Sequence, residues 1–111
     1  MKWEALGKDD HVLLTVEGRL DAVTAAEFNQ AATKARELAS ARLLVDLSGL
    51  AFISSAGLRG ILALAKNCQQ DSRSLAFCGL TPMVADVFKI SGFLSILKVF
   101  PDQAAALTGE W

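Results

Sequence analysis

Two adjacent serines, Ser54 and Ser55, are the side chains in this sequence best placed to do chemistry. They close the apolar run of the segment DLSGLAFISSAGLR, residues 46–59, and open a predicted helix. A serine at a helix start can cap the helix by accepting a backbone N–H, which stabilises it by about 1 kcal/mol. It can also accept a phosphate, because free amides and the positive dipole end favour negative charge there. The small residues Ala56 and Gly57 would let another protein's active site approach, so the segment predicts a phosphorylation site or simply a cap.

A hydrolytic role for the same serine is disfavoured. Residues 55–57, Ser-Ala-Gly, superficially resemble the end of a nucleophile elbow, but Ile53 stands where its first glycine should be. No histidine follows Ser55, and His11 precedes it on another predicted strand. The sequence also contains neither GxxxxGK[ST] nor GxGxxG, the phosphate-binding glycine loops. A small serine-dependent hydrolase therefore stays only as an alternative, and no catalytic residue and no cofactor are predicted.

Composition excludes further classes of function. The 111 residues hold 11 Lys+Arg, 12 Asp+Glu and 1 His, for a net charge of -1. Without net positive charge, nucleic-acid binding through phosphate contacts is not expected. One histidine and two separated cysteines offer no metal site.

The cysteines and the apolar runs indicate a soluble, cytoplasmic protein. Cys68 and Cys78 form no CxxC pair and are expected to be buried, reduced thiols. Charged residues near the N-terminus interrupt any signal-peptide pattern, and no apolar run is long enough to span a bilayer. Membrane insertion is therefore not predicted.

Periodicity of apolar residues predicts the elements that position the serines. Strands are expected at residues 3–7, 12–17, 43–45, 75–78 and 96–100, with a break at 18–21 and an end at Asp46. Helices are expected at residues 24–39, from Ser54 or Ser55 to 70, at 81–92, and after 101–102. Thr24 and Glu27 have the spacing of a capping box, and Thr81 precedes a proline at a helix start.

This order of elements predicts the fold class. Two strands followed by alternating helices and strands indicate an α/β fold, an open mixed β-sheet packed with about four helices. The length, with no linker or repeat, predicts a single domain over residues 1–111. The strand order cannot be inferred from the sequence.

The serine segment also resembles a known family. The run DLSGLAFISSAGLRGIL, residues 46–62, resembles the signature of STAS domains, the sulfate transporter and anti-anti-sigma fold. Weaker matches follow in the same order along nearly the whole chain: VEGRLD at 16–21, TP at 81–82 and FPD at 100–102. A free-standing domain of this length resembles a bacterial anti-sigma factor antagonist more than a transporter tail.

The resemblance implies a protein switch. In the family, the unphosphorylated antagonist binds a serine-kinase anti-sigma factor of the histidine-kinase-like ATPase fold, and this binding releases the sigma factor. The kinase then phosphorylates one serine, the complex separates, and a serine phosphatase would reset it. By alignment on the Gly-Leu that follows, the acceptor is Ser55, while Asp21 matches an acidic loop position. Many members carry Asp immediately before the acceptor serine, whereas this chain has Ser54 at that position. Because Ser54 also carries a hydroxyl, it is the alternative acceptor.

The expected partner-binding surface groups these positions. It comprises Asp21, Ser54, Ser55, Ala56, Gly57 and Arg59. Arg59 lies one turn after Ser55, where it either softens the added charge or is an ordinary surface residue. Two non-enzymatic alternatives need no acceptor serine: a STAS subunit of a membrane lipid-transport complex, and a module that binds nucleotide or another small ligand.

Overall fold

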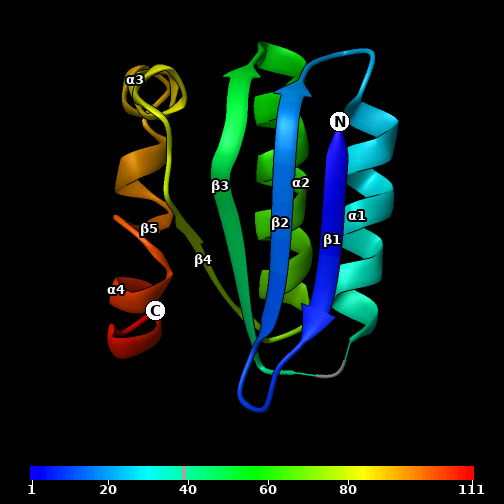
Figure 1. Cartoon of the computed structure of the whole chain (residues 1–111), viewed down its shortest axis with the longest axis vertical. Coiled ribbons are helices and arrows are strands. Elements are labelled where there is room, and N and C mark those ends of the chain that lie inside the picture. The colour runs from blue at the N-terminus through cyan, green and yellow to red at the C-terminus, as the bar shows by residue number, and fades with distance from the viewer. Residues whose placement is uncertain (39) are drawn as a thin grey trace.

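A five-stranded open sheet forms the centre of the computed structural model, which describes residues 1–38 and 40–111. The strands lie in chain order: β1 (Lys2–Gly7), β2 (Val12–Leu20), β3 (Arg42–Ile53), β4 (Ser74–Cys78) and β5 (Lys98–Phe100). β1 pairs with β2 in antiparallel fashion, and every other neighbouring pair is parallel. The mixed α/β fold is confirmed (Figure 1), and the strand order is the part that the sequence left open.

Helices cover both faces of this sheet. The described helices are α1 (Ala25–Glu37), α2 (Ser55–Gln70), α3 (Pro82–Ile90), the short 3-10 helix η1 (Phe93–Ser95) and α4 (Gln103–Thr108). α1 and α2 lie side by side behind the sheet in Figure 1. Phe28 of α1 and Ile61 of α2 belong to the main core cluster. A smaller cluster on the opposite face packs Leu44 and Cys78 against Ala106 of α4. Burial on both faces explains why residues 43–45 of β3 are wholly apolar.

Two strands are longer than the sequence predicted. β2 continues through the expected break to Leu20, with Gly18 at φ +102° and a register irregularity between Gly18 and Arg19. β3 does not end at Asp46 but continues to Ile53, still paired with β2. The polar and glycine residues of these stretches occupy exposed or irregular positions of the sheet, where they need not interrupt pairing. No separate loop therefore divides β3 from the serines.

The boundaries of other elements also differ from those that the sequence predicted. β5 begins at Lys98 and not at Ile96, because Ile96 and Leu97 donate their N–H groups to Phe93 O and so close the turn of η1. α1 is described as far as Glu37, and its expected end near Ala39 lies outside the described residues. The predicted strands at β1 and β4 and the predicted helices α2, α3 and α4 are confirmed.

Candidate functional site

The two serines lie where β3 ends, beside the end of β2. Leu20 and Ile53 are register partners, and the Ser54 N–H donates to Leu20 O over 3.0 Å. Because these strands are parallel, the chain leaves both at one edge of the sheet, the upper end in Figure 1. Asp21 and Ser54 therefore begin neighbouring connections, and the structure brings the predicted loop and the predicted serine segment together.

Ser54 is the cap of α2. Its backbone is extended (φ -102°, ψ 177°), and its Oγ accepts a hydrogen bond from the Gly57 N–H at 3.3 Å. Its carbonyl accepts the N–H of Leu58 at 2.9 Å. The Ser54 side chain is half-buried and satisfies one of the free amides of the helix start.

Ser55 is the first residue of α2 and is exposed. Within the described residues, its hydroxyl makes no hydrogen bond to the protein. Ser54 thus acts as the cap, and the Ser55 hydroxyl is left exposed at the N-terminal, positive end of the dipole of a 16-residue helix. Of the two serines that the sequence offered as the cap, Ser54 is therefore the one that caps α2.

Gly57 fixes how closely α2 approaches the sheet. It is buried, and a Cβ at this position would lie 2.6 Å from Leu20 O and 2.8 Å from Ile53 Cγ1. Both distances are too short for a side chain, so only glycine fits without movement. Its small size thus serves the packing inside the protein, whereas Ala56 is half-buried and Arg59 is exposed.

Asp21 organises the connection from β2 to α1. Its Oδ1 accepts the N–H groups of Val23 (3.0 Å) and Thr24 (3.2 Å), while Thr24 Oγ1 accepts the Asp21 N–H and donates to Arg19 O. The hydrogen bonds from Thr24 and Val23 hold the pKa of the Asp21 carboxyl below its ordinary value. The carboxyl is therefore ionised at neutral pH. The predicted capping box at Thr24 is wrong, because its hydroxyl bonds backward into this turn and not to the helix.

Arg19 adds a cation beside this turn. Its Nε lies 3.6 Å from Asp21 Oδ2, and its guanidinium lies 4.1 Å from the centre of the Phe52 ring. The side chain is 62% exposed, so the ion pair contributes little to stability but keeps the guanidinium over the end of β3.

Two exposed apolar side chains follow the carboxyl ends of the parallel strands, and the sequence did not predict their exposure. Val23, in the turn after Asp21, is 88% exposed, and Met83, in the first turn of α3, is 36% exposed. α3 is tied to β3 by the Thr81 hydroxyl, which donates to Leu50 O at 2.9 Å instead of capping its own helix. The only sequence signal for Val23 is an apolar residue within a polar turn.

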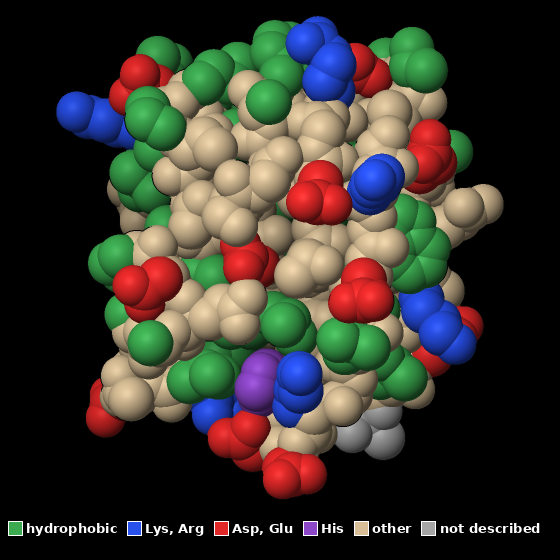
Figure 2. Space-filling model, viewed as in Figure 1, with side chains coloured by type: hydrophobic (Ala, Val, Ile, Leu, Met, Phe, Trp, Pro, Cys, Tyr) green, Lys and Arg blue, Asp and Glu red, His purple; other side chains and the backbone are tan. Residues whose placement is uncertain are grey.

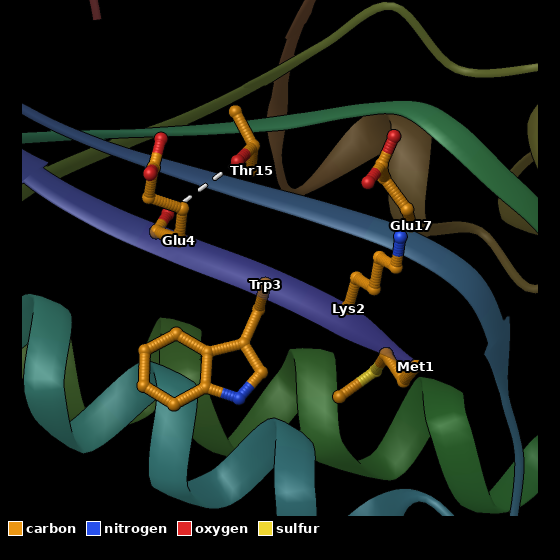
Figure 3. A pocket seen from close by; sticks show the side chains of 6 residues that line it. All are labelled: Met1, Lys2, Trp3, Glu4, Thr15 and Glu17. Carbon is orange, nitrogen blue, oxygen red and sulfur yellow. Dashed lines mark hydrogen bonds between the residues drawn. The ribbon is translucent and has the colours of Figure 1, made fainter.

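The face of the molecule opposite α1 and α2 carries charges of both signs (Figure 2). A hollow of about 490 Å³ beside the edge strand β1 is lined by Met1 and by side chains of β1 and β2 (Figure 3). There Trp3 points toward the helices, whereas Glu4 and Thr15 lie on the other side of the strand. The hollow includes none of the predicted site residues.

Both cysteines are buried and free, as the sequence predicted. Burial raises the pKa of each thiol, and that of Cys78 reaches about 12. Across residues 1–38 and 40–111, no group of three or more His, Cys, Asp or Glu side chains could hold a metal ion. No described helix is both long enough and apolar enough for a membrane span.

Comparisons with known proteins identify the family. The model of the STAS domain matches residues 2–106. A Bordetella bronchiseptica protein, named as a candidate anti-sigma factor antagonist, BtrV, is 36% identical over 98 residues, which are 88% of this chain and 84% of that protein.

Solved structures agree on the fold. An anti-sigma factor antagonist from Mycobacterium paratuberculosis superposes with a TM-score of 0.86 at 22% identity, covering 96% of this chain and 91% of that one. The antagonist SpoIIAA, solved in its unphosphorylated form, gives a TM-score of 0.75 at 17% identity over 95% and 93% of the two chains. SpoIIAA has also been solved in the phosphorylated form, with a TM-score of 0.69 at 16% identity over 95% and 96%. The family match, the 36% identity to BtrV and the shared fold agree with one another: this chain belongs to the STAS domain family.

Proposed function

We propose that this chain is an anti-sigma factor antagonist that works as a phosphorylation switch at Ser55. Its unphosphorylated form binds a serine-kinase anti-sigma factor, and this binding releases the sigma factor. The observation that carries the proposal is the division of roles at the start of α2. Ser54 uses its hydroxyl as the cap, whereas Ser55 presents an exposed hydroxyl without a partner in the described chain.

The relatives support this role from a separate direction. BtrV, which is named as a candidate anti-sigma factor antagonist, aligns with 88% of this chain. SpoIIAA is an antagonist known in phosphorylated and unphosphorylated forms. We infer the same kind of two-state regulation here, with the partner kinase supplying the catalytic groups and a serine phosphatase restoring the hydroxyl. The protein itself acts as a cytoplasmic regulator and not as an enzyme.

The switch operates at the interface and leaves the fold intact. A phosphate on Ser55 would add about 1.5 to 2 negative charges, taking the net charge from -1 to about -2.5 to -3. At a helix N-terminus the dipole and the free amides favour this charge, so α2 is not expected to unfold. Against a partner surface that fits a neutral hydroxyl, the same charge costs desolvation and repulsion. Its repulsion is greatest beside the phosphates of a kinase-bound nucleotide.

Neighbouring groups define the surface that the partner would contact. The ionised Asp21 carboxylate lies at the same edge of the sheet and adds to the negative potential after phosphorylation. Arg59, one turn after Ser55 on α2, provides an exposed cation. We propose that Val23 supplies apolar contact, because an aliphatic side chain 88% exposed beside the site is suited to burial by a partner.

Affinity capture from the source cells tests this function. Wild-type protein and the Ser55→Ala variant, each immobilised, should both capture a serine kinase of the expected fold. Added ATP should release the kinase from the wild type and leave it bound to the variant. Failure of both baits to capture a kinase would contradict the antagonist role. Equal release from both baits would contradict Ser55 as the switch residue.

A further inference from the structure

A second concave surface lies at the other end of α2. It is a groove of about 460 Å³ between the later turns of α2, the start of β4 and the segment that enters β5. Its lining residues are Leu62, Ala65, Lys66, Cys68, Gln69, Arg73, Leu75, Ile96, Leu97 and Lys98. The nearest lining residue of α2, Leu62, lies two turns or about 10 Å along the helix from Ser55, and Ser55 does not line the groove.

The floor of the groove is apolar and reaches the core. Leu62, Leu75 and Leu97 are half-buried and pack against the main core cluster, and Cys68 is almost fully buried. At the rim, Ile96 is 64% exposed. An aliphatic side chain this exposed beside a concave apolar floor provides surface that a ligand could cover.

The rim of the groove is positively charged. Lys66, Arg73 and Lys98 line it, and no carboxylate does. The nearby Asp71 carboxylate is already held by Arg36, at 2.9 and 3.2 Å. Within the described residues, neither Lys66 nor Lys98 forms an ion pair, which leaves both ammonium groups available to an anion.

We propose that this groove binds a free anionic amphiphile, a long-chain carboxylate. The carboxylate head accepts charge-assisted hydrogen bonds from Lys66 and Lys98, and the alkyl tail lies on Leu62, Leu75 and Ile96. The volume falls within the range of small-ligand pockets, about 300–1,000 Å³. Burial of the tail supplies affinity, while Lys66 and Lys98 select the negative charge of the head group.

The test is a titration of the whole chain with dodecanoate, below its critical micelle concentration, followed by backbone amide NMR. The proposal predicts saturable shifts confined to the groove, at amides such as those of Cys68, Leu75 and Leu97. Dodecyltrimethylammonium has the same tail and the opposite charge, and it should bind at least tenfold more weakly. Equal binding of the two head groups, shifts scattered outside the groove, or no saturation by dodecanoate would overturn the proposal.

Variants test the same contacts. The double variant Lys66→Glu/Lys98→Glu should weaken dodecanoate binding at least tenfold, and Ile96→Ser should also weaken it. Lys34→Glu, an exposed lysine on α1 outside the groove, is the matched control and should bind like the wild type. All four side chains are exposed, so these variants should fold, and their amide spectra check this. Unchanged binding by the double variant would overturn the assignment of the head-group site.

Discussion

Gly57→Ala tests how the start of α2 is positioned. The added Cβ would lie 2.6 Å from Leu20 O, which cannot retreat without weakening its hydrogen bond from the Ser54 N–H. Helix propensity alone favours Ala by about 0.8–1 kcal/mol. Adding a carbon to a well-packed core lowers the free energy of unfolding by about 1–3 kcal/mol, and the 2.6 Å contact with Leu20 O places this substitution toward the upper end of that range. We therefore expect the free energy of unfolding to fall by about 1–2 kcal/mol.

Gly60→Ala is the matched control, one turn further along the same helix. Its Cβ would meet Phe28 Cδ2 at 3.3 Å, a longer contact than that of Gly57 and one with a side chain instead of a backbone carbonyl. Its free energy of unfolding should stay unchanged or rise by up to about 1 kcal/mol. Urea unfolding followed by circular dichroism measures both variants. If Gly57→Ala is as stable as Gly60→Ala, contact with the Leu20 carbonyl does not position the helix.

Three further predictions concern the site itself. Ser54→Ala should lower the free energy of unfolding by about 1 kcal/mol through loss of the cap, whereas Ser55→Ala should leave it nearly unchanged; equal urea midpoints for the two variants would count against the assigned roles. Ser55→Glu should fold normally but bind the partner kinase about 100-fold more weakly, a change of about 2.8 kcal/mol, and calorimetry giving wild-type affinity would argue against an interfacial switch. Because hydrogen bonds lower the pKa of Asp21 from 3.8 in the folded state, its stabilisation is present above this pH and is lost as pH falls through the lowered pKa. Acid unfolding of Asp21→Asn should therefore depend less steeply on pH below about 4, and an unaltered profile would show that the turn gains nothing from the ionised carboxylate.

The cap of α2 was predictable because capping is a local preference. Serine is favoured just before an apolar helical pattern, so the sequence limits the candidates for the N-cap residue to Ser54 and Ser55. The choice between them depends on where β3 ends. The sequence predicted an end at Asp46, while pairing with β2 carries the strand to Ile53 and leaves Ser54 as the first residue outside it.

The turn at Asp21 shows why local patterns can mislead. Thr24 and Glu27 match the spacing of a capping box, in which the Glu27 side chain would accept the Thr24 N–H, but Asp21 lies three residues before Thr24 and competes with Glu27 for that N–H. The carboxylate takes the N–H of Thr24, and the Thr24 hydroxyl bonds to Arg19 O instead. The strand order and the packing of Gly57 against Leu20 depend on contacts between distant residues, which no short sequence pattern contains.

Mapping the phosphate tests the central claim most directly. The chain would be incubated with ATP and its captured kinase, and the modified residue identified by tandem mass spectrometry. The account predicts one phosphate on Ser55, none on the Ser55→Ala variant, and retained incorporation on Ser54→Ala. Incorporation at Ser54, or full incorporation into Ser55→Ala, would contradict it.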